Sequence, residues 1–166
     1  MPRFCRWFAI LAMAACLTPA AAGETDRSVR PAQLRFDPQF ILAEVARRMN
    51  VTLRPDIPVP PVFFESATPL RRFQDAIVVQ WRFRPHVFAN AYSVVRNEIY
   101  LIDEAAYYSR RGRTIDDSLA HEFAHYLQVH YLSGDLADPT LESDAVAVQH
   151  LFRQDHVFTK RAEAVR

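Results

Sequence analysis

The fold is decided by residues 115–127, Ile-Asp-Asp-Ser-Leu-Ala-His-Glu-Phe-Ala-His-Tyr-Leu, which carry the pattern His-Glu-x-x-His at 121–125. Apolar residues flank the pattern at helical spacing, and Thr114 is a suitable N-cap. Asp116 and Asp117 would follow in the first turn, where a helix dipole favours acids. The segment therefore predicts a helix that runs to about Leu132 and ends at Ser133-Gly134-Asp135.

Two histidines four positions apart lie on one face of a helix, one turn apart. At that spacing His121 and His125 can share a Zn²⁺ ion, with bonds of about 2.1 Å. Glu122 would lie beside that face and could accept a proton from a zinc-activated water without binding the metal. The alternative is a solvated helix face, which the apolar flanks disfavour. We therefore expect one Zn²⁺ per chain, held by both histidines.

A third protein ligand must come from outside the motif. Gln128 and Tyr131 stand where the layout H-E-x-x-H-x-x-G-x-x-H requires glycine and histidine, which excludes that arrangement. His130 points away from the face shared by the other two histidines. The remaining candidates are carboxylates that follow the helix: Asp135, Asp138, Glu142 and Asp144.

Among these carboxylates, the helical pattern favours Glu142. Asp138 precedes a proline and suits the N-cap of a last helix, from about residue 140 to 154. Glu142 shares a stripe with Ala145, whose small side chain would let two helices approach, whereas Asp144 points elsewhere. We therefore expect Glu142 to be the third ligand. The alternative is an exposed first-turn glutamate favoured by the helix dipole.

The rest of the chain predicts an α+β domain. Helices are expected over residues 38–50, 70–81 and 103–111, and Asp37-Pro38 and Thr68-Pro69 mark the first two starts. The β-rich runs 92–95 and 98–102 flank Arg96-Asn97, which suits a two-residue hairpin turn. The exposed edge of that hairpin could bind an extended substrate as an added strand.

Four prolines between residues 55 and 61 limit the preceding and following apolar runs, 51–53 and 62–65, to short or edge strands. The expected architecture is one domain with three or more helices and a small mixed or antiparallel sheet.

The motif His121-Glu122-x-x-His125 is followed seventeen positions after His125 by Glu142-Ser143-Asp144-Ala145, in the form E-x-x-A. This combination resembles the gluzincin zinc metallopeptidases, especially minimal single-domain members such as the ImmA/IrrE-like peptidase domains. The resemblance covers about residues 89–152. It implies a zincin-like fold, in which a sheet edge, an active-site helix and a glutamate-bearing helix surround one zinc. It also implies His121, His125 and Glu142 as ligands and Glu122 as general base.

The sequence departs from this family in two places. Larger gluzincins hold a histidine ligand with an aspartate four residues after the ligand glutamate, where this chain has Val146. Asp117, one turn before His121, is the expected replacement. No motif identifies the group that steadies the oxyanion. The available side chains are His150, His156, Tyr126 and Tyr131.

The first 22 residues are typical of a secretory signal peptide. Arg3 and Arg6 precede an apolar run at 8–17, and an A-x-A pattern ends the segment. The run is short for a membrane-spanning anchor. Lipid attachment at Cys16 is a less favoured alternative. We expect an exported chain, periplasmic or secreted, with no stable membrane insertion after cleavage. A flexible arm is expected at residues 23–36 and the metallopeptidase domain at 37–166.

Composition limits the function classes. Of 166 residues, 50% are hydrophobic and only three are glycine, which indicates a compact domain rather than a disordered chain. The net charge of +1 is spread without basic blocks, so nucleic acid is not an expected partner. The expected function is a zinc metalloendopeptidase acting on a peptide or protein substrate. The alternatives are an inactive zinc-binding module that recognises a protein partner, and a structural domain stapled by zinc.

Overall fold

The computed structural model describes residues 31–158. Its elements are, in chain order, α1 (Pro38–Arg48), β1 (Val62–Phe64), the 3₁₀ turn η1 (Glu65–Ala67), α2 (Leu70–Trp81), β2 (Ala91–Ser93), β3 (Glu98–Leu101), α3 (Ala105–Ser109), α4 (Ile115–Tyr131), α5 (Pro139–Phe152) and the π-helical segment η2 (Arg153–Phe158). The predicted α+β class is confirmed.

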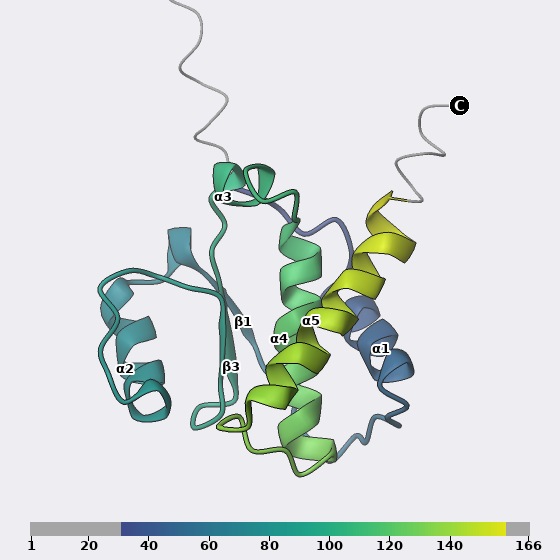
Figure 1. Cartoon of the computed structure of the whole chain (residues 1–166). Coiled ribbons are helices and arrows are strands. Elements are labelled where there is room, and N and C mark those ends of the chain that lie inside the picture. The colour runs from purple at the N-terminus through teal and green to yellow at the C-terminus, as the bar shows by residue number, and fades with distance from the viewer. Residues whose placement is uncertain (1–30, 159–166) are drawn as a thin grey trace, which may run out of the picture.

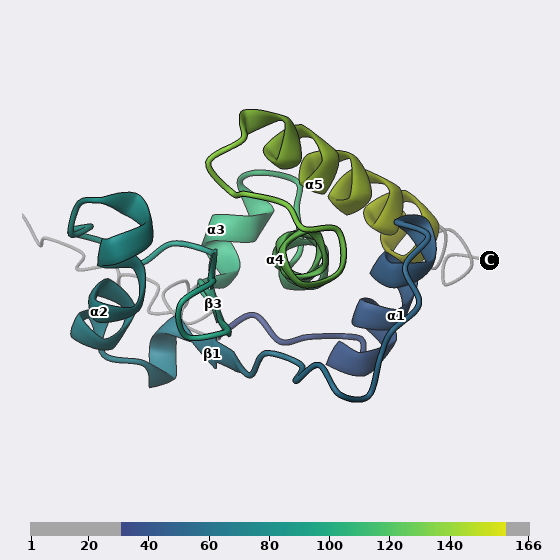
Figure 2. The same cartoon turned by 90° about the horizontal axis from the view of Figure 1, so that it is seen from below.

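Helix α4 is the centre of the fold (Figure 1). The view along its axis shows α5, α1 and the sheet arranged around it (Figure 2). Direct contacts join α4 to α1, α5, β2 and β3. The helix that carries the His-Glu-x-x-His motif therefore also organises the core.

Three of the predicted helix starts are made by their predicted caps. The Asp37 side chain accepts a hydrogen bond from the Gln39 N–H, and Asp138 accepts one from Thr140. At the start of α4, Thr114 and Asp117 form a reciprocal capping box. These caps fix where α1, α4 and α5 begin, and so fix which residues of α4 and α5 face each other.

The sheet is small and mixed, with strand order β1-β3-β2. Strand β1 is parallel to β3, with Val62 opposite Ile99, and β2 is antiparallel to β3, with Tyr92 opposite Ile99. The hairpin turn is longer than the predicted two residues: residues 94–97 form it, and Asn97 adopts a left-handed φ of 49°. Of the two proline-flanked runs, 62–65 supplies the edge strand β1, and 51–53 forms no strand.

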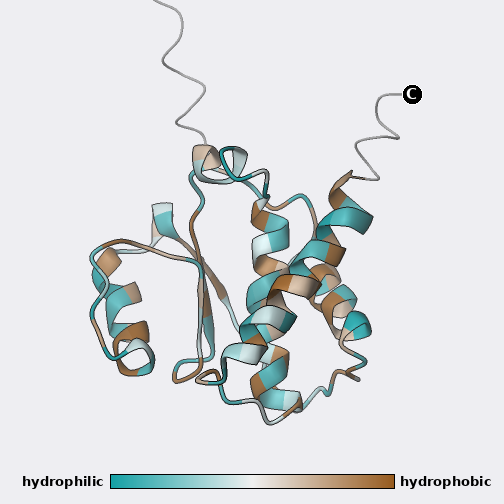
Figure 3. Ribbon diagram, in the orientation of Figure 1, coloured by the Kyte–Doolittle hydropathy of each residue, from teal (hydrophilic) through white to brown (hydrophobic). Residues whose placement is uncertain are grey.

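Helices cover both faces of this sheet. Ile99 and Leu101 of β3 pack into the core around α4, while Tyr100 packs with Phe73 and Ile77 of α2. This alternation is the period of two expected of a strand buried on both faces. Hydrophobic positions recur along the strands and the helices that flank them (Figure 3).

Residues 31–36, the part of the predicted 23–36 arm that the structure describes, pack against the domain. The backbone N–H groups of Arg35 and Phe36 both donate to the buried carboxylate of Asp116, at 2.7 and 3.1 Å. Ala32 donates to the carbonyl of Asp103. A carboxylate at the start of α4 therefore anchors this segment, which composition alone did not reveal.

The predicted signal peptide and the rest of the arm lie outside the described residues. Within residues 31–158, no helix combines the length and the apolar character needed to cross a membrane.

A charged cluster fastens the C-terminal segment η2 to α1. Glu44 lies 3.0 Å from Arg47, 2.7 Å from Arg48 and 3.0 Å from His156, and Arg48 also reaches Asp155. The hydrogen bond from Arg47, supported by Arg48 and His156, lowers the pKa of Glu44 to about 2. The ionised carboxylate is therefore favoured in the folded state.

We expect Glu44→Gln to lower the free energy of unfolding by about 1 kcal/mol at pH 7, after allowing for solvent screening. Because the folded pKa is depressed, this contribution is present above about pH 4.5 and declines as the pH falls towards 2. Urea unfolding measures the difference in free energy of unfolding between the variant and the wild type. This difference should be less than half as large at pH 3 as at pH 7. Glu104→Gln, which removes a mostly exposed ion pair with Arg110, is the control. A difference that is constant with pH would contradict this account.

Candidate metal centre

The two motif histidines project from one face of α4. Their Nε2 atoms lie 3.1 Å apart, and their side chains are only 14% and 12% exposed. Burial lowers the pKa of His121 to about 4, and the positive charges of His125 and Arg113 act in the same direction. His121 is therefore neutral at pH 7, which is the form that binds a metal.

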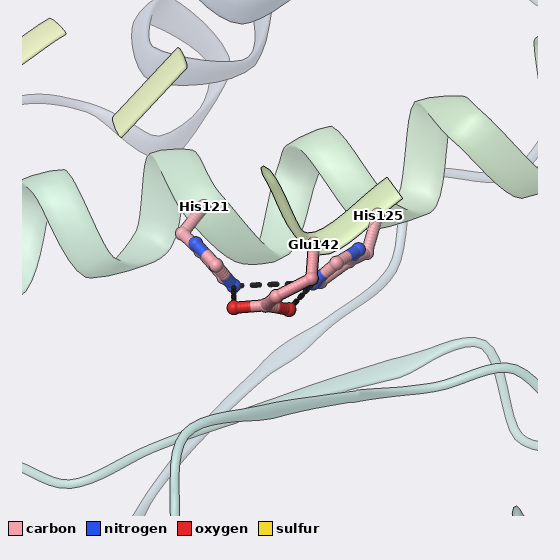
Figure 4. Close-up of side chains that lie close together, drawn as sticks. All are labelled: His121, His125 and Glu142. Carbon is pink, nitrogen blue, oxygen red and sulfur yellow. Dashed lines mark hydrogen bonds and ion pairs between the residues drawn. The ribbon is translucent and has the colours of Figure 1, made fainter. Parts of the chain in front are cut away.

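Glu142 reaches the same point from the first turn of α5 (Figure 4). Its carboxylate oxygens lie 3.5 Å from His121 Nε2 and 3.1 Å from His125 Nε2. Ala145, one turn later, is fully buried between the helices, as the predicted close approach requires.

Gly134 also permits this approach of α5 to α4. A Cβ at this position would lie 2.9 Å from the Leu141 side chain and 3.0 Å from the Gln128 carbonyl.

Of the four candidate carboxylates, only Glu142 joins the histidines. Within residues 31–158, His121, His125 and Glu142 form the one group of three or more potential ligands with donor atoms all within 4.8 Å. Asp138 caps α5, Asp135 accepts the Ala137 N–H, and Asp144 is exposed.

The donor set fits a zinc ion. In a tetrahedral site with bonds of about 2.1 Å, neighbouring ligand atoms are about 3.4 Å apart. The two Nε2 atoms are 3.1 Å apart, and the two oxygens of Glu142 lie one near each ring, Oε1 at 3.5 Å from His121 and Oε2 at 3.1 Å from His125. Two imidazoles and one carboxylate are also a donor set that Zn²⁺ binds in catalytic sites, with a further position left for water or substrate.

Gln128 fixes the orientation of His125, and the sequence did not predict this role. Its Nε2 donates to the Leu141 carbonyl at 2.8 Å, which leaves its Oε1 as the acceptor, 2.9 Å from His125 Nδ1. His125 Nδ1 must then carry the proton, so the lone pair of Nε2 faces His121 and Glu142. Gln128 therefore selects the imidazole tautomer that can bind a metal, and it joins α4 to the residue beside Glu142.

Replacing Gln128 with leucine should weaken zinc binding about tenfold, because the ring loses the acceptor that holds its tautomer and angle. Competition with a chromophoric chelator measures this affinity. Gln128→Glu keeps an acceptor for His125 and should retain most of the affinity lost in the leucine variant. Equal zinc affinity in wild type and Gln128→Leu would show that the hydrogen bond does not position the ligand.

Asp117 does not hold a histidine ligand, so that prediction is wrong. One of its carboxylate oxygens takes part in the Thr114 capping box, and the other accepts a hydrogen bond from Gln149 at 2.8 Å. One oxygen of the carboxylate therefore caps the start of α4, and the other links α4 to α5. His121 Nδ1 is buried without a hydrogen-bond partner among residues 31–158.

Glu122 is buried beside the three donors, with 4% of its surface exposed. Burial, followed by the charge of Glu142, raises its pKa to about 8, while the backbone N–H of Tyr92 acts in the opposite direction. Burial therefore favours the protonated form of this carboxyl.

Two adjoining clefts of about 220 and 250 Å³ open onto this group. They share Asn90, His121, Glu122 and Glu142. One extends towards Tyr107 and Arg113, and the other towards Gln80 and Trp81. A small substrate group could therefore approach the carboxyl and the three donor atoms from solvent.

The four side chains considered for the oxyanion are all engaged elsewhere. Tyr126 contacts the Pro58 carbonyl, Tyr131 contacts Arg54, His150 contacts Arg153, and His156 contacts Glu44. None of the four lines either cleft, whereas Tyr107 and Arg113 do. Tyr107 and Arg113 precede α4 outside the motif, and no sequence pattern marks them.

Comparison with known proteins finds no matching family model, curated protein or solved structure. Any function must therefore be argued from the site itself.

Proposed function

We propose that this chain is a zinc-dependent metallopeptidase with a zincin-like fold, which hydrolyses peptide bonds in a peptide or protein substrate. The proposal rests chiefly on one observation: three donor atoms from α4 and α5 lie within 4.8 Å of one another, next to the buried carboxyl of Glu122. His121, His125 and Glu142 would hold the ion.

The chemistry divides between the metal and the protein. When bound, Zn²⁺ makes a water more acidic and polarises a substrate carbonyl. Glu122 accepts the proton of the attacking water and returns it to the leaving amine. Its position supports this role, because Glu122 lines the same cleft as His121, His125 and Glu142 and can reach a water held there.

Tyr107 and Arg113 are the best placed groups to steady negative charge on the carbonyl oxygen. Both line the cleft that contains His121 and Glu122. A phenol and a guanidinium can each donate a hydrogen bond to an oxyanion, and the guanidinium also brings a positive charge. We assign them this role in place of the histidines and tyrosines considered from sequence.

Two observations favour an enzyme over a zinc-stapled structural domain. The cluster offers three protein ligands rather than the four of a closed structural site. The side chain of Glu142 is 61% exposed, and clefts reach the donors. An inactive binding module would have no need of a buried carboxyl beside the donors. Export after removal of residues 1–22 is also part of the proposal and rests on the sequence of that segment.

The test combines metal analysis with an activity assay. The purified protein should contain about one zinc per chain, and it should cleave members of a set of extended peptides. Absence of zinc from protein purified without chelators, and failure to bind added zinc, would refute the metal centre. Bound zinc without cleavage of any peptide above the Glu122→Gln background would leave the inactive binding module as the function.

A further inference from the structure

The outer edge of β2 runs beside the metal centre. Among residues 31–158, strand β2 pairs with β3 on one side only, and its other side contacts Gln80 near the end of α2. An unpaired strand edge is the place where an extended peptide can add as a further strand. Whether this edge is free or occupied therefore affects how a peptide could reach the donors.

The side chain of Gln80 already occupies this edge. Its Nε2 donates to the Tyr92 carbonyl at 3.1 Å, and its Oε1 accepts from the Val94 N–H at 3.1 Å. Backbone groups of residues two apart lie on the same edge of a strand, so both contacts are on the side away from β3. The Tyr92 N–H, on the same edge, is near Glu122.

A glutamine amide has the same donor and acceptor as a backbone peptide group. By bonding one carbonyl and the next N–H of that edge, Gln80 satisfies two backbone groups that an added strand would otherwise pair with. The expected open edge is therefore closed between Tyr92 and Val94.

The position of Gln80 links the metal centre to an apolar groove. Gln80, Trp81 and Leu136 line both the cleft that holds His125 and Glu142 and a neighbouring groove of about 640 Å³. Valine side chains dominate the walls of that groove: Val79, Val94, Val95 and Val129. A strand added to β2 would pass from the donors into this groove.

We infer that Gln80 is a placeholder, which an extended peptide with apolar side chains displaces when it binds along β2. The inference rests on the proposed function and specifies its substrate class. Displacement exchanges two hydrogen bonds of the glutamine for two of the peptide backbone. Gln80 therefore weakens binding of every extended peptide and is a positioning residue rather than a catalytic one.

The test measures peptide binding without cleavage. The zinc-loaded Glu122→Gln protein is titrated against a fluorescent hexapeptide of alternating threonine and valine, and anisotropy gives the Kd. Adding Gln80→Ala should lower the Kd about three- to tenfold, because the peptide no longer competes with the glutamine. Gln80→Met, which keeps the length of the side chain but not its hydrogen bonds, should behave similarly.

Two controls separate this effect from others. Gln74 is also in α2, and its amide donates to the Pro85 carbonyl away from the clefts, so Gln74→Ala should leave the Kd unchanged. A hexapeptide with every backbone nitrogen methylated has no N–H to donate to a strand edge from either side, so it should bind weakly, and its Kd should not fall in the Gln80 variants. Circular dichroism and thermal unfolding confirm that each variant is folded.

An unchanged or higher Kd in both folded Gln80 variants would overturn the inference, since it would mean that Gln80 does not compete with the peptide. A lower Kd that persists with the methylated peptide would also overturn it. Tighter binding in the variants, combined with no hydrolysis by the wild type, would support the placeholder and refute the peptidase proposal. The two failures are thus distinguishable.

Discussion

Glu122→Gln protein is expected to keep its zinc and its fold while its hydrolysis of extended peptides falls by at least about 100-fold. Glutamine has the size of glutamate and can make hydrogen bonds, but it cannot accept and return a proton. Glu122 is not one of the three converging donors, so its replacement should leave zinc content unchanged. The initial rate of peptide hydrolysis and the zinc content, both measured on the same preparations, test the loss of activity and the retention of metal.

The surroundings of Glu122 favour a stable variant. The wild-type carboxyl is buried and its pKa is raised, so a neutral amide removes an unfavourable buried charge at high pH. A loss of activity accompanied by a loss of folded protein would therefore contradict the assigned role. Activity retained within a few fold of wild type would show that another group accepts the proton.

Glu142→Gln should weaken zinc binding by at least about 100-fold, more than a change in a supporting residue usually does. Three protein ligands hold the ion in our proposal, and this change removes the only anionic one. The Glu142 side chain is 61% exposed and lies in the first turn of α5, so its replacement should have little effect on the core. Competition with chelators measures the zinc affinity. Thermal unfolding with and without zinc then measures the stability of the fold.

Asp144→Asn is the matched control, because Asp144 is an exposed carboxylate two positions away on the same helix. Its zinc affinity should equal that of the wild type. If Asp144→Asn lost zinc while Glu142→Gln retained it, the ligand set would be wrong and the approach of α5 to α4 would need a different explanation.

Sequence was sufficient where an arrangement depends on residues close in the chain. His121 and His125 share a helix face whatever surrounds them, and the caps Asp37, Thr114 and Asp138 act within three residues of themselves. Glu142 was predictable because its helix follows α4 after a short turn, and the small Ala145 marks the face that packs.

Sequence was insufficient where one side chain could serve several partners. The Asp117 carboxylate accepts from the Thr114 N–H at the start of α4 and from the Gln149 amide, and these roles prevailed over a contact with His121. Gln128 is an ordinary helix residue until the turn after α4 brings the Leu141 carbonyl within reach. Gln80 contacts β2 only because the chain between α2 and β2 returns to pack beside it.

The arrangement of the metal centre has a consequence for the order of folding. Seventeen positions separate His125 from Glu142, whereas 37 separate Val62 of β1 from its partner Ile99 in the sheet. Closing a short loop costs less chain entropy, and long-range strand pairing is generally slow. The α4–α5 pair can therefore bring its donors together before β1 joins β3. A metal bound at that stage would stabilise the folding transition state, so zinc would act on the rate of folding as well as on the lifetime of the native state.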